Sequence, residues 1–247
     1  MLNYELKGEG PYLLLIHGFL CTSSAWELMV SRLEKSYELI LIDLPGHGDS
    51  KDILCDDIEQ MAKQIKLVLD KLGISQCSVL GHSMGGYVAL ELANCYPNLI
   101  KELNLIHSTP FADSSEKKRQ RQRAINAVKK THRLFVSQFI PKLFAIQNIQ
   151  KCIIYIADLE KEAMMVSKEC IIKSLEAMRS RKDLSDVIES WPFKTRIILG
   201  LDDPVIDSEV IMARYSQSPN VEVSCISETG HMGFYECPDK CSALLLA

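Results

Sequence analysis

The residues of this chain with the clearest chemical potential are residues 81–85, which read Gly-His-Ser-Met-Gly. An apolar segment precedes them, and a helix-like segment at residues 86–93 follows. This arrangement is typical of a nucleophile elbow, a sharp turn from strand to helix that exposes a serine hydroxyl, here that of Ser83. Glycine at positions 81 and 85 permits the strained turn and the close packing of helix on strand. Because a helix N-terminus also favours negative charge, we predict that Ser83 attacks an acyl group.

A serine hydroxyl is too weak an acid to attack a carbonyl unaided, so it needs a base and an anion that orients the base. We predict that His231 is the base, because it lies among glycines just beyond the last expected strand. Asp203 follows the preceding strand, and the chain order Ser, Asp, His fits this architecture. Asp202 and Asp113 remain alternatives for the acid, since each also follows an expected strand.

The tetrahedral intermediate of acyl transfer needs two N–H donors that hold its negatively charged oxygen. We predict that the backbone N–H of Met84, the residue after the nucleophile, supplies one of them. The backbone N–H of Phe19 supplies the other, because the first long strand ends just before it, beside the elbow. Four further side chains are candidates for lining a substrate pocket: His17, Leu20, His82 and His107.

The elements that would position these residues alternate between strand and helix. Apolar segments predict strands at residues 2–7, 12–17, 39–43, 103–107, 195–200 and 221–226. Helical periodicity covers residues 58–72, with a start signal in residues 56–59 and a stop at Gly73, and a second helix is expected at about 208–215. The alternation predicts an α/β fold with a mostly parallel central sheet flanked by helices.

The alternation breaks off in the middle of the chain, where helical periodicity runs without a convincing strand. We predict an inserted helical cap at residues 110–191 and an α/β core formed by residues 1–109 and 192–247, with a last helix ending at Ala247. Within the cap, residues 117–123 are strongly basic and suit a solvated helix face or a landing site for an anionic substrate group. Apolar cap residues would roof an acyl pocket or form the cap's own core: Phe135, Phe139, Leu143, Phe144, Ile146, Met164 and Met165.

Composition describes an ordinary α/β protein whose partner is a small molecule. The 247 residues are 47% hydrophobic and carry a net charge of -4, which gives no field that would attract nucleic acid or an anionic membrane. The N-terminus lacks the features of a signal peptide, so we expect a cytoplasmic protein. The nine cysteines are an odd number without metal-ligand spacing, which favours reduced thiols. We expect no cofactor and no metal, and nothing indicates a homo-oligomer, although one is compatible with the sequence.

Five segments together resemble the α/β-hydrolase superfamily, of the compact bacterial type with a helical cap. They are residues 17–20, 43–50, 81–86, 200–203 and 230–231, and they occur in the family's order across nearly the whole core. The resemblance implies that the acid is the residue three past Gly200, which is Asp203. It also implies that residues 43–50 shape the edge of the site without acting in catalysis. Ser83, where some relatives have aspartate, argues against haloalkane dehalogenase or epoxide hydrolase chemistry.

These observations predict a serine hydrolase that cleaves an ester or thioester of a small to medium organic acid through an acyl-enzyme, a carboxylic ester hydrolase in class. Two alternatives remain open. The same residues serve carbon–carbon bond hydrolysis or elimination in family members of aromatic degradation and menaquinone biosynthesis. A ligand receptor with little turnover could also retain them, since fold does not dictate function. The physiological substrate and the pathway depend on cap geometry that the sequence leaves undetermined.

Overall fold

A central sheet organises the computed structural model, which describes residues 1–246; the expected helix end at Ala247 lies outside the described residues. Across these residues the sheet has seven strands in the order β1-β3-β2-β4-β5-β6-β7. Its first strand, β1, is antiparallel to β3, and the remaining neighbours are parallel. The predicted fold class is therefore confirmed. The strands are β1 (Tyr4–Lys7), β2 (Tyr12–Ile16), β3 (Glu38–Ile42), β4 (Cys77–His82), β5 (Ile100–Ile106), β6 (Thr195–Gly200) and β7 (Val221–Ile226).

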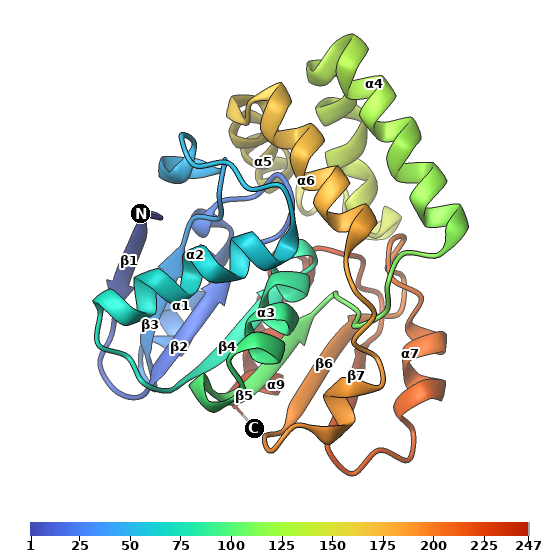
Figure 1. Ribbon diagram of the computed structural model, residues 1–247. Coiled ribbons are helices and arrows are strands. Elements are labelled where there is room, and N and C mark those ends of the chain that lie inside the picture. Colours follow the sequence, from blue (N-terminus) through green and yellow to red (C-terminus); the bar gives the residue numbers. More distant parts are fainter. Residues whose placement is uncertain (247) are drawn as a thin grey trace.

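Helices cover both faces of the sheet, which is why β2, β3 and β4 are buried along nearly their whole length rather than at alternate residues. In Figure 1, α2 and α3 lie in front of the strands, where they pack on each other, while α1 and α9 pack together behind. The core helices are α1 (Glu27–Leu33), α2 (Ile58–Lys71), α3 (Met84–Cys95), α7 (Ser208–Tyr215), α8 (Gly233–Glu236) and α9 (Pro238–Leu246). Helix α2 begins where the sequence predicts, because the Asp57 side chain caps it by accepting from the backbone N–H of Gln60.

The segment between β5 and β6 is helical and lies over the carboxyl ends of the strands, at the top of Figure 1. Its helices are α4 (Ser115–Phe139), α5 (Ile153–Met165) and α6 (Lys168–Ser180). Helix α4 packs against both α5 and α6, and non-helical dihedral angles at Thr131 kink it. We call this segment the cap. Short 3₁₀ helices complete the described chain at Ser23–Trp26, Gly48–Ser50, Pro97–Leu99, Ile140–Leu143, Ile146–Asn148 and Val187–Ser190.

Four strands have bounds that differ from the sequence prediction. Strand β2 ends at Ile16 rather than at residue 17, and β3 spans Glu38–Ile42 rather than 39–43. The differences at β1 and β5 are larger. The first strand begins at Tyr4 rather than Leu2, although Leu2 is buried in the core. Strand β5 begins at Ile100 and ends at Ile106, because His107 adopts a positive φ of 48° that takes the chain out of the extended conformation.

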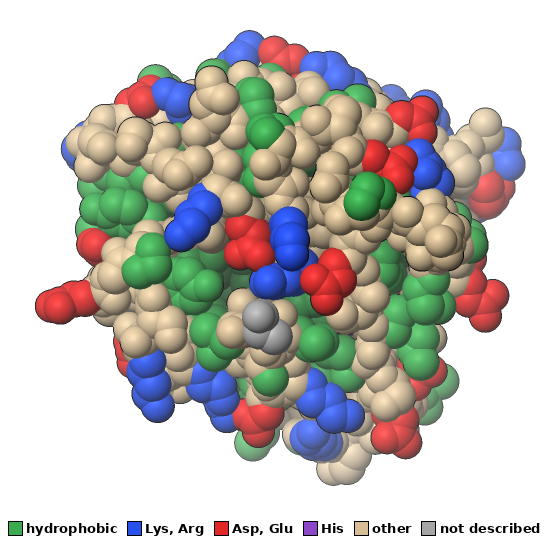
Figure 2. Space-filling model, turned by 90° about the horizontal axis from the view of Figure 1, so that it is seen from below, with side chains coloured by type: hydrophobic (Ala, Val, Ile, Leu, Met, Phe, Trp, Pro, Cys, Tyr) green, Lys and Arg blue, Asp and Glu red, His purple; other side chains and the backbone are tan. Residues whose placement is uncertain are grey.

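The face of the molecule opposite the cap shows Lys and Arg side chains interspersed with Asp and Glu (Figure 2). This face therefore has no broad field of a single sign. Within residues 1–246, no helix has both the length and the apolar character needed to cross a bilayer. All nine cysteines are free thiols in the described chain.

Candidate active site

Ser83 occupies a strained turn between β4 and α3. Its φ of 51° and ψ of -116° lie outside the regions that non-glycine residues favour, which is the kind of strain found at functional sites. Two glycines make the turn sterically feasible. A Cβ at position 81 would lie 2.6 Å from the carbonyl oxygen of Gly85, and one at position 85 would lie 2.3 Å from the carbonyl oxygen of Ile16. The Ser108 hydroxyl donates to the carbonyl oxygen of Ser83 at 2.8 Å and braces the turn.

Ser83, His231 and Asp203 form a continuous hydrogen-bonded chain. His231 Nδ1 lies 2.8 Å from Asp203 Oδ2 and 3.0 Å from Oδ1, while His231 Nε2 lies 2.8 Å from Ser83 Oγ. Because a carboxylate only accepts, Nδ1 carries the proton, and Nε2 is left to accept from the serine hydroxyl. This is the tautomer that a general base needs.

The surroundings keep the Asp203 carboxylate ionised. Burial opposes ionisation, but the charge of His231 and hydrogen bonds from His107 and His231 outweigh it, so the pKa of Asp203 lies well below its usual range. The backbone N–H groups of Val205 and Ile206 also donate to Asp203 Oδ1, at 2.8 and 3.0 Å. The carboxylate is thus fixed in orientation as well as in charge.

The two alternative acids lie elsewhere. Asp202 is exposed and accepts from the Gln147 side chain at 2.6 Å. Asp113 is bound by two guanidinium groups, those of Arg121 and Arg181, each at 2.5 Å. The structure thus brings Asp203 to the imidazole and gives the other two carboxylates different partners.

Two backbone donors flank the Ser83 hydroxyl. The loop after β2 lies against the elbow so closely that a Cβ on Gly18 would come within 3.3 Å of Ser83 Cβ. Among residues 1–246, the N–H groups of Phe19 and Met84 donate to no acceptor. Met84 N also belongs to the first turn of α3, where the helix leaves its N–H groups unpaired. Both N–H groups are therefore unpaired, as the donors of an oxyanion hole need to be.

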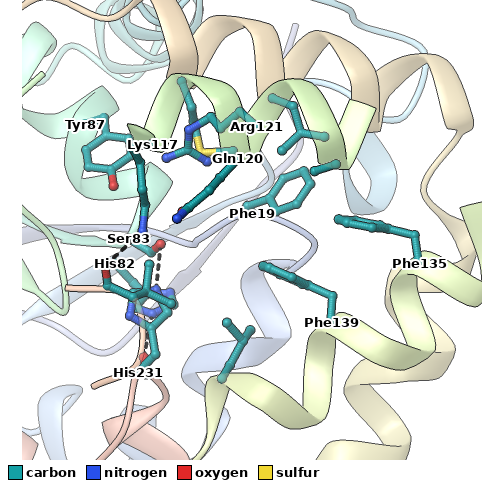
Figure 3. Close-up of a pocket in the computed structure, with 15 residues that line it drawn as sticks. Phe19, His82, Ser83, Tyr87, Lys117, Gln120, Arg121, Phe135, Phe139 and His231 are labelled. Carbon is teal, nitrogen blue, oxygen red and sulfur yellow. Dashed lines mark hydrogen bonds between the residues drawn. The ribbon is translucent and has the colours of Figure 1, made fainter. Parts of the chain in front are cut away.

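A cavity of about 180 Å³ opens over Ser83 and His231, between the core and the cap. Figure 3 shows that its walls differ in chemistry: Phe19, Phe135 and Phe139 lie on one side, and Tyr87, Lys117 and Arg121 lie on the other. The complete lining is Phe19, His82, Ser83, Tyr87, Lys117, Gln120, Arg121, Ala124, Phe135, Phe139, Leu143, Leu175, Met178, Val205 and His231. The arrangement can bind an acyl compound with an apolar part and a polar part.

Of the four candidate pocket residues, the structure places His82 on the cavity wall and the other three outside it. His17 is fully buried, where its Nε2 accepts from the Leu44 N–H at 2.9 Å and its Nδ1 donates to the Gly18 carbonyl at 2.8 Å. Leu20 is a core residue. His107 is also fully buried; its Nε2 accepts from Gly233 N at 3.2 Å, and its Nδ1 lies 3.4 Å from Asp203 Oδ2. These residues support the site from behind.

The basic segment 117–123 divides between two faces of α4. Arg119 and Arg123 are exposed and pair with Glu116, at 2.6 and 2.8 Å, as a solvated face would. Lys117 and Arg121, one helical turn apart, line the cavity instead.

The apolar cap residues fall into three groups, which line the cavity, are buried or partly buried in the core, or are exposed. Phe135, Phe139 and Leu143 line the cavity, and Phe144 is buried in the core. Met164 is half-buried against the core, whereas Ile146 and Met165 are 87% and 85% exposed.

Sequence reasoning missed Glu236, a buried carboxylate that holds the loop carrying His231. Its Oε1 accepts from the N–H groups of Gly230 and Met232, at 3.1 and 3.2 Å. Its Oε2 accepts from Gly230 N, Ala145 N and the Asn148 side chain, at 3.0, 3.1 and 2.7 Å. The available signal was a lone acid in the otherwise uncharged stretch after His231.

No cluster of three or more His, Cys, Asp or Glu side chains in the described part of the chain is arranged to hold a metal ion.

A family model, curated proteins and solved structures are similar to this chain. Residues 11–125 match the family model described as alpha/beta hydrolase fold. A pimeloyl-(acyl-carrier protein) methyl ester esterase of Nitrosomonas europaea is 38% identical over 109 residues, which are 44% of this chain and 42% of that protein. The dihydrolipoyllysine-residue acetyltransferase component of the acetoin cleaving system of Pseudomonas putida is 27% identical over 266 aligned residues, covering 99% of this chain and 65% of that protein. This chain thus spans less than two thirds of the length of either relative.

Among solved structures, a thermophilic esterase from Thermogutta terrifontis superposes with a TM-score of 0.92 at 25% identity. The match covers 99% of this chain and 91% of the esterase, so it includes the cap as well as the core.

Proposed function

Because this chain belongs to the α/β-hydrolase fold family, we propose that it is a serine hydrolase cleaving an ester or thioester of a small to medium organic acid. The observation that carries the proposal is the hydrogen-bonded chain from Ser83 through His231 to Asp203. Ser83 and His231 lie on the wall of the cavity. The names of the relatives refer to pimeloyl and acetyl groups, which supports chemistry on an acyl compound.

In the first half of the reaction, His231 Nε2 takes the proton from Ser83 Oγ as the oxygen attacks the carbonyl carbon of the substrate. Asp203 stabilises the imidazolium that forms and remains ionised itself. The N–H groups of Phe19 and Met84 stabilise the negative charge on the carbonyl oxygen, where loss of one such donor typically costs about 10²–10³ in rate. His231 then gives its proton to the leaving alcohol or thiol, and an acyl-serine remains.

In the second half, a water molecule occupies the place of the leaving group. His231 removes its proton, the resulting hydroxide attacks the acyl-serine, and the same backbone donors bind the second tetrahedral intermediate. Collapse of this intermediate returns the proton to Ser83 Oγ and releases the acid. Each turnover consumes one water and restores the starting tautomer of His231.

The test is hydrolysis of p-nitrophenyl esters from acetate to laurate by wild type and by Ser83→Ala, together with labelling by a fluorophosphonate. We expect ester turnover that Ser83→Ala abolishes, and one covalent adduct that mass spectrometry locates on Ser83. Labelling without ester turnover would instead favour carbon–carbon bond cleavage by the same residues. The absence of both labelling and ester turnover would contradict the proposal and favour a binding role.

A further inference from the structure

Lys117 brings a positive charge to the cavity, and no carboxylate within residues 1–246 forms an ion pair with it. Its side chain extends from α4 toward Ser83 (Figure 3) and is partly buried in the cavity wall. Within residues 1–246, its amine makes one hydrogen bond, to the carbonyl oxygen of Val205 at 3.1 Å, and has no carboxylate oxygen within 4.0 Å. An ammonium group has three N–H donors, so two of them remain for a ligand.

Charged neighbours do not change this conclusion. Burial lowers the pKa of Lys117, and the positive charge of Arg121 acts in the same direction, while Asp113 and Asp203 oppose it. Asp113 is already bound by Arg121 and Arg181, and Asp203 is bound by His231. Lys117 and Arg121 line the cavity, and Asp113, which does not line it, is shared by Arg121 and Arg181. The Lys117 ammonium therefore has no carboxylate partner of its own in the described chain.

Tyr87 supplies a second unused donor to the same wall. Its ring is held by the Arg181 guanidinium, which stacks on it at 3.9 Å from the ring centre. Its hydroxyl has no hydrogen-bond partner in the described chain, and in Figure 3 it lies on the same side of the cavity as Lys117. A point charge and a hydroxyl suit the two oxygens of a carboxylate. A phosphate dianion is better matched by arginine forks, and those of Arg121 and Arg181 are occupied by Asp113.

We propose that Lys117 and Tyr87 bind a carboxylate carried by the substrate, so that the compound cleaved is a monoester or thioester of a dicarboxylic acid. The proposal rests on the serine hydrolase function and adds the substrate class. In the bound state the apolar chain lies along Phe19, Phe135 and Phe139, and the reacting carbonyl lies at Ser83. The free carboxylate accepts hydrogen bonds from the Lys117 amine and the Tyr87 hydroxyl on the opposite wall.

The experiment compares monomethyl esters of dicarboxylic acids of five to eight carbons with methyl esters of monocarboxylic acids of equal carbon number. The readout is the ratio of kcat/KM for the two members of each pair, in wild type, Lys117→Met, Lys117→Arg and Tyr87→Phe. Lys118→Met is the matched control, because its side chain is exposed on the same helix. Free dicarboxylates are tested in parallel as competitive inhibitors, which reports binding without turnover.

We expect wild type to prefer the carboxylated esters and Lys117→Met to lower the ratio about ten- to hundredfold, the worth of a hydrogen-bonded charge. Tyr87→Phe should lower it less, Lys117→Arg should retain most of it, and Lys118→Met should leave it unchanged. High salt should weaken inhibition by free dicarboxylates.

A wild-type kcat/KM ratio near one, or a ratio that Lys117→Met does not change, would refute the carboxylate site. The proposed serine hydrolase function would still hold if the neutral esters are hydrolysed in a Ser83-dependent reaction. Absence of Ser83-dependent hydrolysis with every ester would instead refute the proposed function. The two failures are therefore distinguishable in one set of assays.

Discussion

Replacing Glu236 by glutamine tests whether a buried carboxylate behind the site positions the base. The side chain keeps its shape but exchanges one oxygen for an amide NH2 group. If that group replaces Oε2, it faces the donors of Ala145 and Asn148; if it replaces Oε1, it faces Met232 N, while Gly230 N keeps its bond to the other oxygen. The second orientation is the better one, because it leaves fewer donors without an acceptor.

Even the better orientation leaves two buried donors facing each other, the N–H of Met232 and the new amide. Each unsatisfied buried donor costs about 1–3 kcal/mol, so Glu236→Gln should lower the free energy of unfolding by about 2–6 kcal/mol. Gly230 and Met232 flank His231, so movement there shifts the imidazole. A displacement of about 1 Å can cost about 10² in rate, and we expect kcat to fall at least tenfold.

The assays are urea unfolding followed by circular dichroism, and ester turnover at a temperature where the variant is folded. Glu9→Gln is the control for loss of one carboxylate, since Glu9 is exposed in the turn between β1 and β2. A Glu236→Gln protein whose stability lies within about 0.5 kcal/mol of wild type, with unchanged kcat, would refute the reasoning.

Three further predictions follow from buried or crowded positions. Burial, followed by the charge of His17, lowers the pKa of His47 to about 3. In the unfolded chain the same imidazole binds a proton near pH 6.5, so the free energy of unfolding falls by up to about 1.4 kcal/mol per pH unit as the pH drops below that value. His47→Gln should therefore flatten the dependence of the unfolding free energy on pH between pH 7 and 5. Gly85→Ala places a Cβ 2.3 Å from two backbone oxygens and should abolish the native circular dichroism spectrum, whereas Gly73→Ala, with open space but a φ of 69°, should cost only about 1 kcal/mol. Phe139→Ala enlarges the apolar side of the cavity and should move the p-nitrophenyl ester optimum to longer acyl chains; an unchanged optimum would place the acyl group elsewhere.

Local patterns made the fold and the elbow predictable from the sequence. The turn at Ser83 needs small flanking residues, and the buried strands need continuous apolar segments, so both leave a trace within a few residues of the feature itself. The helix at 58–71 was predictable for the same reason, because its cap, its apolar stripe and its stop are consecutive in the chain.

Features that depend on contacts between distant segments could not be predicted in the same way. His17 and Leu20 are close in sequence to Phe19, and His107 ends an expected strand, but all three side chains turn into the core behind the site. Glu236 was missed because most of its partners are backbone N–H groups of two separate segments, which no residue type reveals. For Lys117, the basic residues 117–123 predicted a charged helix, but their spacing did not show which of them face the cavity.

One part of the cap is hydrogen-bonded to the loop that carries His231, and another part is not. The backbone N–H of His231 donates to the carbonyl oxygen of Leu143 at 2.8 Å, and Glu236 binds Ala145 and Asn148 in the same stretch of the cap. Residues 143–148 therefore cannot shift without moving the imidazole. In the described residues, helix α4 makes no hydrogen bond to the His231 loop, and its Lys117 amine reaches the Asp203 loop through the Val205 carbonyl oxygen at 3.1 Å. The helix lines the cavity with Lys117 and Phe139. Changes in α4 can accordingly alter substrate preference while the geometry of proton transfer stays intact.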